Sequence, residues 1–417
     1  MKVDAIGWEN SAVRSVLTGE IACARAMPRV FPGFIAINSH VEPPDSLGDP
    51  FLAACLLPAM FIGEDLEIAA PVSLRLLAAT DTVQDIFLAW FPGKFERIKV
   101  HAAVSRAAVA PSAARRAAVF FSGGVDSWFS LLKHRPEINA LMTVKGFDIP
   151  LADRIVFPQL TAAAREVAAE SGAIALAVET NLRDYLDPWP GHLGRDFGGD
   201  FWGPVLHGAM LGAVGLCLQR HYSRAIIPSS HAFHELFPWG SHPLVDRLWS
   251  TESMAFEHDG CEAIRTAKVA AIARHPEVLR HLRVCADYAP KSYNCGSCEK
   301  CVRTLLALHL HGVRGTVPAF GRTLDFARLE TMAIAPGRER WYHELRAEAE
   351  AQNQADLIRV LRVMLGMQWS TRRQWSRLRE QAGKFGASAL RLSGLPRHAR
   401  SIRKRWNRLR TKQPDQS

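Results

Sequence analysis

The residue types best suited to chemistry lie at 121–127, where the sequence reads Phe-Ser-Gly-Gly-Val-Asp-Ser. The apolar run Ala117–Phe120 precedes this segment, and a helix-like run begins at Trp128. A glycine pair lets the main chain come close to a ligand, and the first N–H groups of a helix have no partner within the helix. Together with the serine hydroxyls and the positive end of the helix, they predict a binding site for a polyanion such as pyrophosphate.

The spacing of the glycines at 122–127 differs from that of two common phosphate loops. The Walker pattern needs four residues between its glycines and then Gly-Lys-Ser/Thr, and the dinucleotide pattern needs a third glycine. Ser-Gly-Gly-x-Asp-Ser instead resembles the PP-loop of the N-type ATP pyrophosphatases, which split ATP into AMP and pyrophosphate to adenylate a substrate. An ordinary strand-to-helix turn rich in small residues is the alternative interpretation.

The cysteines are unevenly distributed along the chain. Cys285, Cys295, Cys298 and Cys301 lie close together with Gly296 in the turn, whereas the other four are scattered. Four thiolates at such short spacing can close a tetrahedral zinc site, and in a cytosolic chain a cluster of this kind indicates metal binding rather than disulfides. The sequence therefore predicts a zinc knuckle, with an iron–sulfur cluster as the alternative.

Taken together, the loop and the Cys-Gly-x-Cys-x-x-Cys cluster resemble the 7-cyano-7-deazaguanine synthase family over residues 117–310. The resemblance implies an adenine nucleotide alpha hydrolase-like fold, ATP and Mg²⁺ as cofactors, and a structural Zn²⁺. It also implies adenylation of a carboxylate or amide on a small molecule or protein, followed by attack of a nitrogen nucleophile.

The same resemblance assigns roles to individual residues. Asp126, Ser127 and Lys268 would be catalytic, with Lys268 offsetting charge on the leaving pyrophosphate; a solvated helix-face lysine is the alternative. The backbone of Val144 would contact adenine. The complete set expected to bind ATP is Ser122, Gly123, Gly124, Val125, Asp126, Ser127 and Val144.

The segment that recognises substrate in this family does not match. Where the family has Gly-Asp-Tyr and later Pro-Asp-Cys-Arg, the chain has Pro228–His231 and Gly240–Asp246. The base-binding pocket is therefore not recognisable, and two other functions stay open: a tRNA thiolase, and a non-catalytic nucleotide-binding module. Further weak candidates for proton transfer or substrate contact, each also explained by a structural or exposed side chain, are His207, His231, His234, His242, Glu179, Asn181, Trp239 and Trp249.

From Ala117 onward the sequence alternates between strand-like and helix-like runs, which predicts an α/β fold with a five-stranded parallel sheet. The expected strands are 117–121, 140–144, 174–179, 224–229 and 282–285, and the expected helices are 126–133, 157–171, 204–221 and 263–273. We expect three domains: a small α+β domain at 1–115 ending in a linker at 107–116, the ATP-binding domain at 116–323, and a helical region at 324–417.

Composition and charge set the remaining expectations. The chain has 417 residues, 48% of them hydrophobic, and a net charge of +10. From Gly366 onward it holds 14 Lys and Arg against 2 Asp and Glu, so the basic charge belongs to the tail. Such a tail favours nucleic acid or another anionic partner, or else a solvated helix. Without a signal-like or membrane-length apolar run, we expect a cytoplasmic protein, with a homodimer as one possible assembly.

Overall fold

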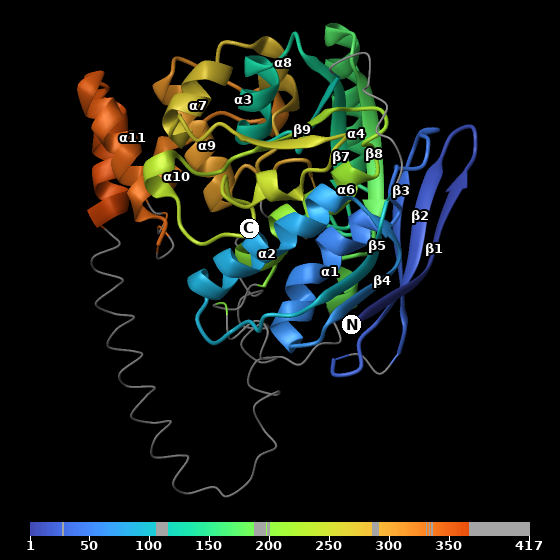
Figure 1. Ribbon diagram of the computed structural model, residues 1–417. Helices are drawn as coiled ribbons and strands as arrows, with labels where there is room; N and C mark the ends of the chain where they lie inside the picture. The colour runs from blue at the N-terminus through green and yellow to red at the C-terminus, as the bar shows by residue number, and fades with distance from the viewer. Residues whose placement is uncertain are drawn as a thin grey trace, which may run out of the picture. The chain divides into compact units, whose positions relative to one another are not determined.

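The structure is a computed structural model that describes residues 1–26, 29–105, 116–186, 197, 201–285, 292–330, 332, 334 and 337–366. These residues form an α/β fold with a mixed sheet and flanking helices (Figure 1). The described residues divide into two compact units, one within 1–325 together with 347–354 and the other within 326–346 together with 355–366. The sheet lies entirely within the first unit.

One half of the sheet is parallel. Its strands, in spatial order, are β10 (Ala255–Asp259), β9 (Arg224–Pro228), β6 (Ala117–Phe120), β7 (Ile138–Lys145) and β8 (Ile174–Thr180). The chain builds β7 and β8 on one side of β6 and then returns to build β9 and β10 on the other. The strand order thus reverses between β6 and β9, and open α/β sheets bind ligands at the carboxyl ends of strands at such a point.

Four of the five expected parallel strands are present near their expected bounds, but the fifth, at 282–285, is wrong. Its place is taken by β10, which the sequence analysis missed. The backbone N–H groups of Val284 and Cys285 donate to the side-chain oxygen of Asn294 at 2.9 and 3.2 Å instead of to a neighbouring strand. Because a side chain accepts these backbone hydrogen bonds, the segment does not require a neighbouring strand as a partner.

The expectation of a five-stranded, fully parallel sheet is also wrong, because the sheet has ten strands and is partly antiparallel. Its other half, continuing from β8, consists of β3 (Phe31–Ile37), β2 (Ser15–Ala22), β1 (Lys2–Asn10), β4 (Leu66–Val72) and β5 (Val100–Val104). The strands β8 and β3 pair antiparallel over only Ile35–Ile37. At that junction, the Thr180 hydroxyl donates to Phe34 O at 2.6 Å, and Asn181 bonds Phe34 N and Pro32 O, each at 2.8 Å.

The helices follow from the strand order. Right-handed crossovers place α3 (Val125–Lys133) and α4 (Val156–Ser171) on one face of the parallel half and α6 (His207–Leu216) on the other. The remaining helical segments are α1 (Asp49–Ile62), α2 (Leu74–Trp90), η1 (Asp184–Leu186), the π-helical η2 (Trp202–Leu206), η3 (Phe233–Glu235), η4 (Asp246–Trp249), α7 (Arg265–Ile272), α8 (Pro276–His281), α9 (Glu299–Leu310), η5 (Pro318–Phe320), α10 (Phe326–Leu329), α11 (Glu339–Ala351) and a helix over 355–366.

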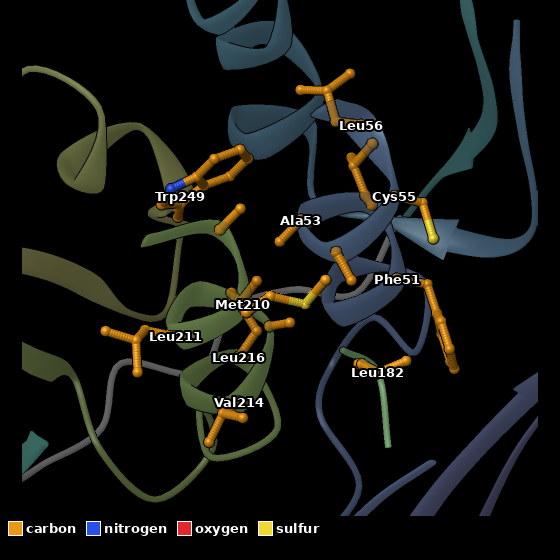
Figure 2. Packing of buried hydrophobic residues seen from close by; sticks show 14 of the residues in the cluster. Phe51, Ala53, Cys55, Leu56, Leu182, Met210, Leu211, Val214, Leu216 and Trp249 are labelled. Carbon is orange, nitrogen blue, oxygen red and sulfur yellow. The ribbon is translucent and has the colours of Figure 1, made fainter. Parts of the chain in front are cut away.

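The core lies where α1 packs against α6 (Figure 2). All residues of α1 from Asp49 to Met60 are buried, as expected of a helix that is apolar on every side. Glycines in α6 allow close contact with its neighbours: a Cβ at Gly212 would lie 3.0 Å from Trp249, and one at Gly215 would lie 2.7 Å from Phe256.

The single long helix expected at 204–221 is not present over those bounds. The segment begins as the π-helical η2 and continues as α6, which ends at Leu216.

Within the part of the chain that the structure describes, no helix is both long and apolar enough to cross a membrane. The basic tail after Gly366 and residues 107–115 of the expected linker lie outside the described residues. The bounds of the three expected domains stay predictions, although one sheet runs through the first two of these domains.

The junction between the two halves of the sheet gives a test of this topology. Asn181→Ala removes the two hydrogen bonds to β3 and should lower the free energy of unfolding by about 1–2 kcal/mol. The measurement is urea denaturation. Asn10→Ala, at an exposed strand end, is the control; equal midpoints for the two variants would contradict the role given to the junction.

Candidate functional site

The loop after β6 turns sharply into α3 at the carboxyl edge of the parallel strands. Gly123 has a φ of +71°, which favours glycine, and a Cβ there would lie 3.2 Å from Leu160 Cδ1 and 3.3 Å from Arg283 Cβ. Gly124 is the N-cap of α3. The turn therefore requires a glycine at position 123, and the expected strand, turn and helix are present.

The polar groups of the loop converge on the start of α3. The Ser122 hydroxyl accepts from Gly124 N at 3.3 Å, the Ser127 hydroxyl donates to Gly124 O at 3.0 Å, and the two hydroxyl oxygens lie 3.5 Å apart. The first hydrogen bond of the helix joins Trp128 N to Gly124 O, which leaves the N–H groups of the preceding turn for a ligand. This combination of donors suits phosphate oxygens.

Asp126 lies between two cations. Its Oδ2 accepts from Arg265 Nη1 at 2.9 Å and its Oδ1 lies 3.5 Å from Lys268 Nζ. Burial by itself would raise the pKa of Asp126, but the charges of Arg265 and Lys268 outweigh this effect and lower the pKa. The carboxylate is therefore ionised at neutral pH, and it holds both cations beside the loop.

Lys268 is buried, with 1% of its side chain exposed, and so is not on a solvated helix face. Its ammonium also donates to Ser229 O at 2.6 Å, at the end of β9. The structure thus brings the expected residues Asp126, Ser127 and Lys268 together at the point where the strand order reverses. Val144 lies one residue before the end of β7, at the same sheet edge; its contact with adenine stays a prediction.

The four cysteines of the predicted knuckle form a compact cluster. The sulfur atoms of Cys285 and Cys298 lie 3.9 Å apart, those of Cys295 and Cys301 lie 4.0 Å apart, and all four lie within 4.8 Å of one another. A single tetrahedral zinc with Zn–S bonds of about 2.3 Å places its sulfurs about 3.8 Å apart. The donor set therefore fits one zinc ion.

The local backbone supports the same interpretation. The N–H of Cys298 donates to the Cys295 sulfur at 3.2 Å, and Gly296 turns the chain between them with a φ of +65°. Cys298 is also the N-cap of α9, which begins at Glu299. The knuckle therefore lies at the start of α9.

The knuckle is attached to the glycine loop. Arg283, two residues before Cys285, donates its N–H to Gly123 O at 2.7 Å. The side chain of Asn294, the residue before Cys295, donates to Leu282 O at 2.8 Å and accepts from Val284 N. These bonds fix the two arms of the knuckle to each other and one arm to the loop.

A buried ion pair that sequence reasoning missed lies near the same sheet edge. His258 donates from Nδ1 to Asp246 Oδ2 at 2.7 Å, and the Ser241 hydroxyl donates to the same oxygen at 2.7 Å. Burial lowers the pKa of His258, but the hydrogen bond and charge of Asp246 outweigh it and raise the pKa to about 9. No local pattern marks this pair, because its members come from η4 and β10.

The weaker candidates are spread around this region. His207 is half-buried, and burial lowers its pKa; His242 is buried against the Trp90 ring, with its pKa lowered for the same reason. His231 contacts Phe237 and Trp239, whereas His234 is exposed. Trp249 packs in the core, Asn181 holds the sheet junction, and Glu179 lies 3.6 Å from Lys145.

No protein-family model, curated protein or solved structure matches this chain. The candidate site consequently rests on the chain's own residues and their geometry.

The His258–Asp246 pair makes stability depend on pH. Because the pKa of His258 is raised on folding, its contribution is fully present below about pH 6.5 and is lost as the pH rises through about 9, an effect of up to about 3 kcal/mol. Urea denaturation at several pH values should show this fall, relative to the double variant Asp246→Asn/His258→Gln. Parallel pH profiles for the two proteins would exclude a charged pair.

The cysteine cluster is tested by metal analysis. The purified protein should hold about one zinc ion per chain, and Cys298→Ser should lose most of it because the tetrahedral donor set is broken. Cys217→Ser, a buried cysteine outside the cluster, is the control. Elemental analysis gives the result, and an unchanged zinc content in Cys298→Ser would contradict the site.

Proposed function

We propose that this protein is an ATP-dependent adenylating enzyme that divides ATP into AMP and pyrophosphate. The activated group would be a carboxylate or amide of a small molecule or protein, and the second substrate a nitrogen nucleophile. The observation that carries the proposal is the Ser122–Ser127 loop at the strand-order reversal, with Asp126 held between Arg265 and Lys268.

The loop supplies the groups that a triphosphate needs. The N–H groups at the start of α3 and the hydroxyls of Ser122 and Ser127 would bind phosphate oxygens. Lys268 and Arg265, held in place by Asp126, would stabilise the negative charge that develops on pyrophosphate as it leaves. Bound Mg²⁺ would add positive charge at the same phosphates.

The proposed zinc has a structural role. Four thiolates complete a tetrahedral site and leave no position for water or substrate, unlike catalytic zinc sites with three protein ligands. The hydrogen bond from Arg283 N to Gly123 O connects the first arm of the knuckle to the glycine loop and so supports a structural role. The metal would therefore fix the loop rather than take part in the reaction.

The rival functions have less support. A tRNA thiolase needs a further redox cysteine pair or an iron–sulfur cluster, and the sulfur spacing fits a single ion. The other four cysteines are buried, and none of them forms a disulfide. A nucleotide-binding module without catalysis would use the same loop, and only turnover separates it from an enzyme. The tail's anionic partner, a homodimer and a cytoplasmic location also stay predictions.

The proposal predicts the products of ATP cleavage. With ATP labelled at the α-phosphate, the label should appear in AMP and not in ADP, and Ser127→Ala or Asp126→Ala should slow its formation by about 100-fold or more. Ser171→Ala, at the far end of α4, is the matched control. Label in ADP, or normal rates in both loop variants, would sink the proposal.

A further inference from the structure

Arg283 lies directly against the glycine loop, although no sequence pattern points to it. Its N–H donates to Gly123 O at 2.7 Å, and its Cβ would lie 3.3 Å from a Cβ placed on Gly123. Its carbonyl oxygen would lie 3.6 Å from a Cβ on Gly124. The Arg283 backbone thus flanks both glycines.

The charge of Arg283 has no counterpart within the part of the chain that the structure describes. Its Nε is buried without a hydrogen-bond partner, and no described carboxylate pairs with its guanidinium. The neighbouring cations differ: Arg265 pairs with Asp126 at 2.9 Å, and Arg280 lies 3.5 Å from Glu170. A partly buried, unpaired guanidinium is costly, so this position favours an anionic ligand.

Tyr293 lies beside the same glycine. Its hydroxyl donates to His281 O at 3.2 Å and would lie 3.4 Å from a Cβ on Gly123, and the Cβ of Arg283 would lie 3.3 Å from that same position. Tyr293 and Arg283 therefore both flank Gly123, and the side chain of Arg283 begins at the loop.

The cysteine cluster fixes the main chain that carries Arg283. Asn294 accepts from Val284 N and Cys285 N, and Cys285 is itself a member of the cluster. Two restraints thus act within two residues of Arg283, and a third is its own bond to Gly123. A side chain on such a restrained segment needs little further ordering to bind a ligand.

We propose that Arg283 is a phosphate ligand of the candidate site, and that the cysteine cluster serves to hold it beside Gly123 and Gly124. This inference rests on the proposed function, and it adds a third cation to Lys268 and Arg265. The planar guanidinium can donate two parallel hydrogen bonds to phosphate oxygens, which suits the pyrophosphate portion of the nucleotide.

Equilibrium binding separates this role from catalysis. Inorganic pyrophosphate and AMP, each with Mg²⁺, are titrated into the full-length protein by calorimetry. Arg283→Gln should weaken pyrophosphate binding by about 10- to 100-fold, the size of a lost charge-assisted hydrogen bond, and AMP binding by less than about 3-fold. Arg283→Lys should fall between these limits because it keeps the charge without the planar fork. Arg280→Gln, the matched exposed control, should bind both ligands normally.

Each other outcome has a definite meaning. Normal pyrophosphate binding by Arg283→Gln overturns the inference. Equal weakening of pyrophosphate and AMP, or a loss of zinc from the variant, shows that Arg283 only supports the loop and also overturns it. If the unmodified protein binds neither pyrophosphate nor an ATP analogue, the proposed function itself fails, which is a distinguishable result.

Discussion

The candidate site depends on the interactions of the buried Lys268 ammonium. A charge that is 1% exposed must be compensated, and its partners are Ser229 O at the end of β9 and the Asp126 carboxylate in α3. Lys268 itself comes from α7. One buried charge therefore joins three elements at the point where the strand order reverses. It also holds the glycine loop and the neighbouring cations in fixed positions relative to one another.

The rest of the unit that contains the sheet supports this arrangement from two directions. On one face, the glycines of α6 allow η4 and β10 to pack closely against that helix, and β10 pairs with β9 over Ala255–Asp259. Beyond α3, the knuckle holds Gly123 through Arg283. The other half of the sheet adds to β8 through the antiparallel strand β3 rather than forming a separate sheet, so β8 is not left as an exposed edge.

Local patterns made part of this structure predictable. A strand, a glycine turn and a helix start are encoded within 117–133, and the spacing of the cysteines alone indicated a closed metal site. The predictions that were wrong concern features that depend on contacts between distant segments. The segment at 282–285 resembles a strand in composition, but its backbone N–H groups donate to the Asn294 side chain. The fifth strand of the parallel half is instead β10, which pairs with β9. No local pattern identifies Asp246, His258 or Arg283 as site residues, because the residues that they contact are distant in the sequence.

The most direct test of the central claim is a crystal structure of the protein with Mg²⁺ and α,β-methylene-ATP, which resists cleavage at the bond in question. The account predicts the β- and γ-phosphates over the Gly123–Ser127 turn, with Ser122, Ser127 and Lys268 within hydrogen-bond distance. A nucleotide bound elsewhere, or phosphates that point away from this turn, would contradict it.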